Sequence, residues 1–418
     1  MDDYNNKSIC VMPWINMSAD TDGRVRLCCI SDTYIKKDDG TNYNLGYDKV
    51  EDIINSTDYK QIRQDMIDGV PIAGCSTCYA NEKNNGRSER QSHNRVWEAE
   101  TNFRRKYKQS LNKENIDETV QYFDLRFGNL CNLACRSCNS GASSQFNKEL
   151  KELQHTKIAK FNHHIISTEL NEWYTTDTFQ NNITNQSKNL FKYYLSGGEP
   201  TLIEKNYEIM QKMIDSGDSK HIVLTLNSNM TNTKIDFYNF FKDFKKVILL
   251  SSLDGTNEMQ EYLRYPSNWK QISNNLEKVV DMKLPNLTVF VNPVIQKTNL
   301  GYITELFEYI ESINRKHDKS ILKIGPITLN EPDYLNLKYL PLDYKISCWE
   351  KIDNWIKTSC KYQTADFHQR IKSIKNSCIE PFDYQQNLAD YFEFTDIFDN
   401  HRGEKLSKIN PELDKLRR

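Results

Sequence analysis

Residues 129–138 carry the most informative pattern of the chain, three cysteines spaced C-x3-C-x2-C in Asn129-Leu130-Cys131-Asn132-Leu133-Ala134-Cys135-Arg136-Ser137-Cys138. Thiolates are soft ligands that suit zinc, Cu(I) or iron–sulfur clusters. Three close thiolates with no fourth nearby leave one coordination position of the metal open. The segment directly follows a β-prone run at 121–127, and the carboxyl ends of parallel strands are where α/β folds bind ligands. The pattern therefore predicts a metal site with an open position at a strand end.

Around this segment, short β-prone runs alternate with helical patterns. The β-prone runs are 121–127, 190–195, 221–226, 247–253, 287–294 and 322–327. The helical patterns between them are 207–215, 237–244, 274–282 and 303–313. Such alternation predicts parallel strands joined by crossover helices, in an open doubly wound sheet or in a barrel.

The segments before and after this α/β region, and one stretch within it, show other sequence patterns. Residues 1–95 are rich in loop signals, contain five cysteines and predict one helix at 56–68. A charged stretch at 98–118 predicts a helical connector with a solvated face, and the Asn/Thr-rich stretch 175–189 predicts an inserted loop. Beyond residue 330 the chain predicts a helical extension.

Composition narrows the class of protein. The 418 residues include 55 Lys and Arg against 57 Asp and Glu, so the net charge of -2 provides no field to attract nucleic acid or an anionic membrane. No cationic segment leads into an apolar run at the N-terminus, and no stretch approaches the ~20 apolar residues of a membrane span. We therefore expect a cytoplasmic protein without a membrane partner. Cytosolic thiols stay reduced, so the 11 cysteines indicate metal binding more than disulfides.

The cysteine segment resembles the signature of the radical S-adenosylmethionine (SAM) enzymes, whose three-cysteine loop follows the first strand of a partial (β/α)6 barrel. The resemblance implies that Cys131, Cys135 and Cys138 hold a catalytic [4Fe–4S] cluster whose open iron binds the amino and carboxylate groups of SAM. Reductive cleavage of SAM would give a 5′-deoxyadenosyl radical that abstracts a substrate hydrogen. One position departs from the family, because Ser137 stands where an aromatic or bulky apolar residue is usual. A zinc knuckle or unrelated buried thiols are the alternative.

The next strand ends in Leu195-Ser196-Gly197-Gly198-Glu199-Pro200, which is similar to the GGEP motif of the family. Glycines let the backbone approach a ligand without interference from a Cβ atom. The resemblance implies that Gly197, Gly198 and Glu199 hold the methionyl amine of SAM. Taken alone, the same residues are ordinary chemistry for a strand-to-helix turn.

Three later strand ends also resemble cofactor-binding positions of the family. They carry small polar residues, as turns at strand ends commonly do. The resemblance implies SAM contacts from these ends and from an arginine in Glu261-Tyr262-Leu263-Arg264, whose planar guanidinium would pair with the SAM carboxylate. The residues concerned are Asn227, Asn229, Ser252, Asp254, Arg264, Asn292 and Val294.

The early cysteines form a second pattern, C-x12-G-x4-C followed by C-x2-C, which suits four-coordinate zinc or a fully ligated iron–sulfur cluster. It resembles the twitch domain, a truncated SPASM domain that binds an auxiliary cluster and normally follows the barrel. The resemblance implies the ligands Cys10, Cys28, Cys75 and Cys78, with Cys29 as the alternate for Cys28. Zinc remains an alternative at this site.

We therefore expect a twitch-like auxiliary-cluster domain at 1–95, a connector at 96–118, a radical SAM partial barrel at 119–330 and a helical extension at 331–418. The resemblance implies a one-electron donor such as flavodoxin or ferredoxin, and a peptide or protein substrate. A small molecule such as a sugar, amino acid or nucleotide derivative is the alternative substrate, and the neutral charge balance disfavours RNA. The alternative from another functional class is a binding module with two structural zinc sites and no catalytic activity. The late cysteines 348, 360 and 378 have no ligand-like spacing and are expected to be buried packing residues.

Overall fold

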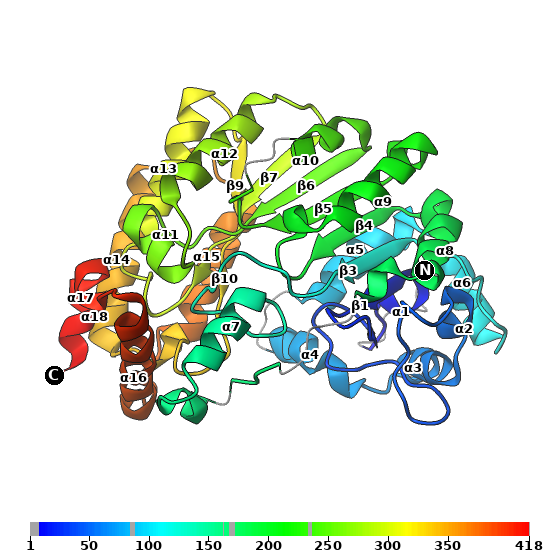
Figure 1. Ribbon diagram of the computed structural model, residues 1–418, viewed down its shortest axis with the longest axis horizontal. Coiled ribbons are helices and arrows are strands. Elements are labelled where there is room, and N and C mark those ends of the chain that lie inside the picture. Colours follow the sequence, from blue (N-terminus) through cyan, green and yellow to red (C-terminus); the bar gives the residue numbers. More distant parts are fainter. Residues whose placement is uncertain (1–7, 84–87, 162, 167–171, 233–235, 418) are drawn as a thin grey trace. The chain divides into compact units, whose positions relative to one another are not determined.

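The computed structural model describes residues 8–83, 88–161, 163–166, 172–232 and 236–417. An eight-stranded sheet with the order β2-β1-β3-β4-β5-β6-β7-β9 organises the α/β fold, and β10 and β8 form a second small sheet (Figure 1). The strands are β1 (Asn16–Ala19), β2 (Val25–Arg26), β3 (Tyr122–Arg126), β4 (Lys192–Ser196), β5 (Val223–Ser228), β6 (Lys246–Ser251), β7 (Leu287–Val291), β8 (Val294–Ile295), β9 (Leu322–Ile324) and β10 (Ile327–Thr328). Only the pair of β1 and β2 is antiparallel among the pairs whose register is defined in the described part of the chain.

All six β-prone runs of the sequence contain strands, so the predicted parallel sheet is confirmed. The last two runs are each divided, into β7 and β8 and into β9 and β10. Pro293 follows β7 and Pro326 follows β9. Proline has no N–H to donate to a strand ladder, which explains why each run breaks there.

Two strands come from the cysteine-rich N-terminal region, where the sequence predicted none. All four residues of β1 are buried, and β1 pairs in parallel with β3 in the register Asn16 to Tyr122 and Ala19 to Leu125. The sequence Asn-Met-Ser-Ala has little β propensity, so its strand is set by tertiary pairing.

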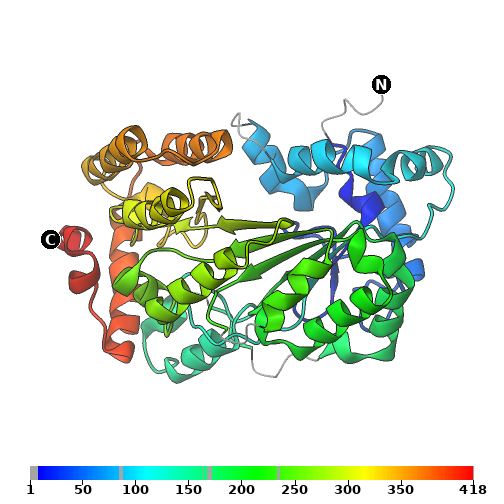
Figure 2. The same ribbon diagram turned by 90° about the horizontal axis from the view of Figure 1, so that it is seen from above.

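The chain divides into two compact units, of which unit 1 comprises Met1–Asn129, Glu169–Leu226 and Phe240–Val247. Its core includes Trp14, whose ring packs edge-on against Phe103 at 5.4 Å. Helices α5 and α6 (cyan) lie on one side of the unit 1 strands, and α9 (green) lies on the other (Figure 2). The helices are α1 (Met12–Ile15), α2 (Val50–Ile54), α3 (Thr57–Ile67), α4 (Ser76–Lys83), α5 (Glu89–Glu100), α6 (Phe103–Leu111), α8 (Asp177–Gln186) and α9 (Glu204–Asp215).

The stretch 98–118 contains the end of α5, which ends at Glu100, and α6, which ends at Leu111, buries Phe103 and Tyr107 and exposes its other face, as predicted for a helical connector. Another prediction about unit 1 is wrong. The stretch 175–189 is not a loop, because it contains α8, which Thr176 caps. Asn and Thr have low helix propensity, but burial of Phe179 and Ile183 outweighs it.

Unit 2 comprises Leu130–Thr168, Asn227–Asn239 and Ile248–Arg418. Its helix α13 buries Leu306, Phe307 and Ile310, and it packs against β9. The region after residue 330 is helical, as expected. The helices of unit 2 are α7 (Ser144–Glu152), α10 (Asp236–Asn239), α11 (Asn257–Leu263), α12 (Trp269–Asp281), α13 (Ile303–Lys316), α14 (Leu342–Thr358), α15 (Ala365–Cys378), α16 (Gln385–Arg402), α17 (Leu406–Ile409) and α18 (Pro411–Asp414).

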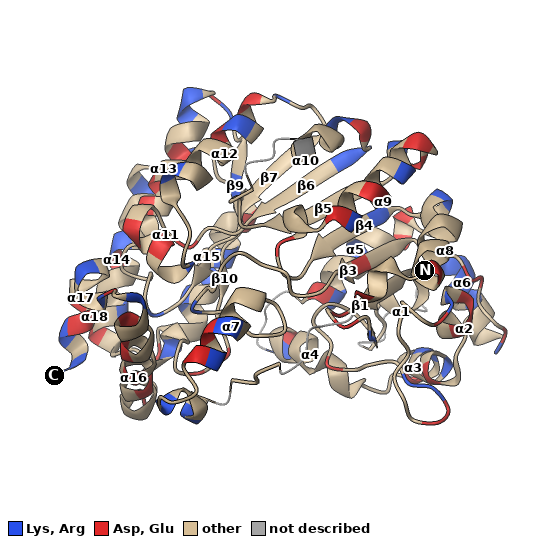
Figure 3. Cartoon of the chain, viewed as in Figure 1, with Lys and Arg blue, Asp and Glu red and all other residues tan. Residues whose placement is uncertain are grey.

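Basic and acidic residues are interspersed along the helices of both units (Figure 3), in keeping with the small net charge of the sequence. Within the described residues, no helix combines the length and the apolar character needed to cross a membrane.

Candidate functional site

The three cysteines of the C-x3-C-x2-C pattern lie on one irregular loop of unit 2, which precedes α7. Cys131 and Cys135 are buried together with Leu133, and Cys138 packs against them. Two backbone hydrogen bonds attach the loop to the end of α11 and the residues after it, from Arg136 N–H to the Leu263 carbonyl at 2.9 Å and from Ala134 N–H to the Tyr265 carbonyl at 2.6 Å. The fold therefore brings the three predicted cluster ligands together.

The chemistry of this donor set fits a metal cluster. Burial raises the pKa of Cys135 and of Cys138 above the ordinary thiol range. Arg264 opposes this at Cys135, since its Nη1 lies 4.0 Å from the Sγ atom. Buried thiolates need positive charge beside them, and bound iron would supply it. Across the described ranges, no group of three or more His, Cys, Asp or Glu side chains is arranged to hold a single metal ion.

Asn229, one of the predicted SAM contacts, lies against the cysteine loop. Its amide nitrogen donates to Asn132 Oδ1 at 3.0 Å and lies 4.0 Å from Cys131 Sγ. Its Oδ1 accepts from the backbone N–H and the hydroxyl of Thr231, at 2.9 and 2.6 Å. Asn229 thus helps to fix the loop, and its contact with SAM stays a prediction.

Asp254 and Arg264 form a buried ion pair. Arg264 Nε lies 2.7 Å from Asp254 Oδ2. The other carboxylate oxygen accepts the Val294 N–H at 2.8 Å, and the Asp254 carbonyl accepts from Asn299 Nδ2 at 2.8 Å. Both carboxylate oxygens are engaged, so Asp254 holds Arg264 and Val294 in place. The sequence predicted all three as cofactor residues, and the fold brings these three together.

The remaining predicted contacts of unit 2 lie at strand ends. Asn227 is half-buried at the end of β5. The Ser252 N–H donates to the Ser228 carbonyl at 2.8 Å, and the Asn292 N–H donates to the Ser251 carbonyl at 2.9 Å. These backbone bonds place the polar side chains of Ser252 and Asn292 just after β6 and β7, as expected for ligand-binding positions of parallel strands.

The Gly197-Gly198-Glu199 segment belongs to unit 1. Gly197 has a φ of +76°, and a Cβ atom at this position would lie 2.6 Å from the Cβ of Arg126. The position therefore requires glycine. Glu199 is buried and caps the 3-10 helix Pro200–Leu202, where its Oε1 accepts from the N–H and the hydroxyl of Thr201 at 3.2 and 2.6 Å.

Three of the four predicted auxiliary ligands form a second group of thiols, in unit 1. The pKa of Cys10 is raised to about 12, mainly by burial and in smaller part by the nearby Cys75 and Cys78. Arg90 opposes this shift from a fixed position, because it bonds the Ile9 carbonyl at 2.7 Å and pairs with Glu82 at 2.6 Å. Neighbouring like charges disfavour ionisation, so this shift indicates that the three thiols lie near one another.

Cys28 and Cys29 interact with each other. A hydrogen bond with Cys28 raises the pKa of Cys29 most, followed by burial and by the nearby Asp124. Cys29 therefore lies beside the polar residues of β3. Cys28 as the fourth auxiliary ligand, with Cys29 as the alternate, stays a prediction.

One face of the unit 1 strands carries buried polar atoms that the sequence interpretation missed. Ser18, Asp124, Tyr194 and Thr225 lie side by side across β1, β3, β4 and β5. Five buried atoms on this face have no hydrogen-bond partner within the described chain: Asn16 Oδ1, Ser18 Oγ, Asp124 Oδ1, Arg126 Nη1 and Thr225 Oγ1. The signal was present in Tyr122, Asp124 and Arg126, which alternate with apolar residues along β3. We call the five residues with unpartnered atoms (Asn16, Ser18, Asp124, Arg126 and Thr225) the polar face.

The charged residues within the polar face and beside it are only loosely paired. Arg126 lies 3.9 Å from Asp20 and from Asp124, too far for a direct hydrogen bond. Lys192 Nζ lies over the rings of Tyr122 and Tyr194, at 4.6 and 5.3 Å. Unpaired polar atoms in a protein interior are costly, so such a group is typical of a site that receives a polar ligand or ordered water.

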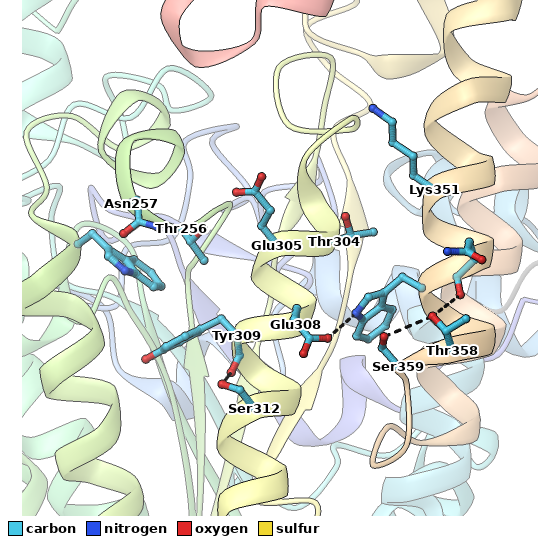
Figure 4. Close-up of a pocket in the computed structure, with 13 residues that line it drawn as sticks. Thr256, Asn257, Thr304, Glu305, Glu308, Tyr309, Ser312, Lys351, Thr358 and Ser359 are labelled. Carbon is cyan, nitrogen blue, oxygen red and sulfur yellow. Dashed lines mark hydrogen bonds between the residues drawn. The ribbon is translucent and has the colours of Figure 1, made fainter.

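A cavity of about 720 Å³ opens elsewhere in unit 2, between α13 and α14 (Figure 4). Its wall includes Trp269, Tyr309 and Trp355, and Glu308 accepts from Trp355 Nε1 at 2.9 Å. None of the predicted site residues lines it. The buried cysteine loop is the better candidate for the chemistry because it holds the reactive side chains.

Comparison with known proteins assigns a domain to each group of thiols. The radical SAM superfamily matches residues 125–310, and the SPASM iron–sulfur cluster-binding domain matches residues 10–79. The first range includes the cysteine loop and every predicted SAM contact, and the second runs from Cys10 past Cys78. The chain is thus similar to the radical SAM superfamily over one range and to an iron–sulfur cluster-binding domain over the other.

Solved structures are only distantly similar. Native anSMEcpe with bound AdoMet is 15% identical with a TM-score of 0.37, and the match covers 57% of this chain and 61% of that chain. Streptococcus suis SuiB bound to S-adenosylmethionine is 15% identical with a TM-score of 0.41, and the match covers 79% of this chain and 68% of that chain. SuiB bound to its precursor peptide SuiA is 14% identical with a TM-score of 0.36, over 85% of this chain and 74% of that chain. The chain thus spans about three fifths of the anSMEcpe structure. No curated protein matches it significantly.

Proposed function

We propose that the protein reductively cleaves SAM at an iron–sulfur cluster held by Cys131, Cys135 and Cys138 and then abstracts a hydrogen atom from a peptide or protein. The observation that carries the proposal is the cysteine loop, where three thiols share one site and Arg264 approaches Cys135 Sγ to 4.0 Å. When bound, the cluster supplies the electron that breaks a carbon–sulfur bond of SAM.

Residues of the chain have separate tasks in this proposal. Asn229 holds the loop through Asn132, and Asp254 orients Arg264 toward the carboxylate of SAM. Glu199 accepts from the methionyl amine, on a backbone that Gly197 and Gly198 leave open. Asn227, Ser252, Asn292 and Val294 complete the cofactor contacts at the strand ends, in a partial (β/α)6 barrel formed by 119–330.

The N-terminal domain supports electron transfer in this proposal. Cys10, Cys75, Cys78 and either Cys28 or Cys29 hold an auxiliary cluster in a twitch-like module at 1–95. Four protein ligands close such a cluster, which suits electron transfer better than direct binding of substrate. A flavodoxin or ferredoxin provides the external electron.

The polar face favours a peptide substrate. Its unpartnered atoms include the acceptors Asn16 Oδ1 and Asp124 Oδ1 as well as the donor Arg126 Nη1. Mixed donors and acceptors match amide groups, which offer one N–H and one carbonyl each. A domain for an auxiliary cluster in the same chain agrees with this, because relatives with such domains often modify peptides.

Metal content tests the proposal first. Anaerobic reconstitution with iron and sulfide should give a brown protein with iron at both cysteine groups, and Cys135→Ala should lose the iron of one group. A colourless protein that keeps stoichiometric zinc after the same treatment would establish the zinc-binding module instead.

Mass spectrometry tests the substrate. A peptide pool incubated with the reconstituted enzyme, SAM and dithionite should contain a peptide whose mass changes only when all components are present. A change confined to a peptide-free fraction of small molecules would assign the alternative substrate class.

A further inference from the structure

The cysteine loop is bound on one side by the C-terminal part of the chain. Residues 127–143 contain neither helix nor strand, so the conformation of the loop depends on its contacts. Two arginines, Arg136 within the loop and Arg402 outside it, pair with carboxylates from distant parts of the sequence. We propose that the end of α16, together with Glu404, is a positioning element that holds the cysteine loop in its cluster-binding conformation. This inference rests on the proposed function of that loop.

Arg402, the last residue of α16, holds the middle of the loop. Its Nη2 donates to the carbonyl of Ala134, the residue before Cys135, at 2.6 Å. The same guanidinium pairs with both carboxylate oxygens of Glu149 on α7, at 2.7 and 2.6 Å. Its side chain is 0% exposed. A planar guanidinium that satisfies a carboxylate and a carbonyl at once fixes their relative positions more strictly than a flexible ammonium group can.

Arg136, which lies between Cys135 and Cys138, provides the second attachment. Its Nη2 lies 2.6 Å from Asp399 Oδ1 on α16 and 2.8 Å from Glu404 Oε2. Its guanidinium also stacks on the ring of Tyr262 at 3.8 Å. The Tyr262 hydroxyl donates to Asp399 Oδ1 at 2.8 Å, so the carboxylate is held from two sides.

Because these ion pairs are buried, loss of one partner should cost stability. An exposed ion pair contributes little, whereas removal of one partner of a buried pair leaves an uncompensated charge in the interior. The side chains of Arg136 and Asp399 are 3% and 9% exposed. Loss of Arg402 should therefore loosen the loop between Cys131 and Cys135, and loss of Arg136 should loosen it between Cys135 and Cys138.

Arg402 also places positive charge next to the cysteine loop, since its guanidinium donates to the carbonyl of the residue before Cys135 at 2.6 Å. Its Nη1 is buried and makes no hydrogen bond with the described chain. A cluster with three thiolate ligands gains negative charge on reduction, and a fixed positive charge nearby stabilises the reduced form. Removal of this charge should shift the reduction potential of the cluster to a more negative value.

The test compares reconstituted wild-type holoenzyme with Arg402→Gln, Arg402→Lys, Arg136→Gln and the control Arg417→Gln. Arg417 forms an equally bidentate pair with Asp396 on the same helix α16 and stacks on Phe392 at 4.4 Å, but touches no loop residue through these contacts. Arg402→Gln and Arg136→Gln should release iron to a chelator at least ten times faster than wild type. Arg402→Gln should also lower the midpoint potential of the cluster whose electron paramagnetic resonance signal responds to SAM.

Arg402→Lys keeps the positive charge but lacks the planar guanidinium that bonds Glu149 and Ala134 at once. It should therefore preserve the midpoint potential of the cluster while still releasing iron faster than wild type. Arg417→Gln should match wild type in both measurements, and far-ultraviolet circular dichroism should match across the set. The inference is wrong if Arg402→Gln and Arg136→Gln release iron as slowly as Arg417→Gln. If wild type itself holds no cluster at this loop, so that Cys135→Ala has the same iron content, the proposed function fails first and the inference fails with it.

Discussion

Arg264 links the cysteine loop to a buried carboxylate. It lies 4.0 Å from Cys135 Sγ through Nη1 and 2.7 Å from Asp254 Oδ2 through Nε. Asp254 in turn accepts the Val294 N–H at 2.8 Å. Three residues that the sequence indicated separately thus act as one unit, in which Asp254 determines where the guanidinium points.

Replacement of Asp254 tests this unit. Asp254→Asn keeps the size of the side chain but removes the charge that Arg264 pairs with, leaving a buried guanidinium uncompensated. We expect the free energy of unfolding to fall by about 3 kcal/mol and the KM for SAM to rise about tenfold, the equivalent of ~1.4 kcal/mol.

Denaturant titration and the rate of SAM cleavage at varied SAM concentration measure these two effects. Asp366→Asn is the matched control, because Asp366 pairs with Arg370 on the surface at 2.7 Å. An unchanged KM in Asp254→Asn would show that Arg264 does not need Asp254 to act on SAM.

Residue types at strand ends could be predicted from sequence, but their partners could not. Asn229 and Asp254 were identified by their positions after strands, whereas their hydrogen bonds to Asn132 and Val294 depend on the folded loops. The polar face was missed because the sequence alone does not distinguish a polar strand residue that is buried from one that is exposed to solvent.

Helix α8 shows how tertiary contacts determine an element. Its sequence Asp-Thr-Phe-Gln-Asn-Asn-Ile-Thr-Asn-Gln predicts a loop, but Asn182 bonds three backbone groups of the N-terminal region. Its side chain accepts the Val50 N–H at 3.1 Å and donates to the carbonyls of Leu45 and Asp48, at 3.1 and 3.0 Å. The low helix propensity of this sequence is outweighed because Asn182 provides hydrogen bonds to buried backbone groups of residues 45–50.

Asn182→Ala should therefore destabilise the protein by about 2 to 3 kcal/mol, because it removes three hydrogen bonds and leaves a buried N–H and buried carbonyls unpaired. Urea denaturation monitored by circular dichroism measures this loss. Asn181→Ala, at an exposed position of the same helix, should be neutral or slightly stabilising because alanine has the higher propensity. Equal effects of the two substitutions would contradict the structural role of Asn182.

Periodic elements were predictable from the sequence for a physical reason. The six runs of the β/α region are short and rich in β-branched, aromatic and other apolar residues, so they stand out as strands. Helix α3 begins at the predicted place because Ser56 caps it. Strand β1 and helix α8 lack such signals, since their stability comes from partners far along the chain.

The whole molecule should lose stability in weak acid. Burial lowers the pKa of His93 to about 4, and its Nδ1 accepts a hydrogen bond from Trp97 Nε1 at 3.3 Å. In the unfolded chain the imidazole binds a proton near pH 6.5. Between about pH 6.5 and 4 the unfolded state therefore holds more protons, so stability falls as the pH falls through this window.

At pH 5 this difference corresponds to about 2 kcal/mol relative to pH 7. His93→Gln keeps a polar group of similar length without a titrating proton, and should show a pH dependence smaller by that amount. Denaturation at both pH values measures it, with the exposed His368→Gln of α15 as the control. Identical pH profiles for wild type and His93→Gln would contradict the assignment.

For the whole molecule, the proposed function rests on two similarities, of residues 125–310 to the radical SAM superfamily and of residues 10–79 to an iron–sulfur cluster-binding domain. The most direct test of the account is the formation of 5′-deoxyadenosine from SAM and dithionite by anaerobically reconstituted protein. We predict formation by wild type and by Cys360→Ala, which removes a half-buried cysteine outside both groups, and none by Cys135→Ala. Formation at the wild-type rate by Cys135→Ala would contradict the central claim.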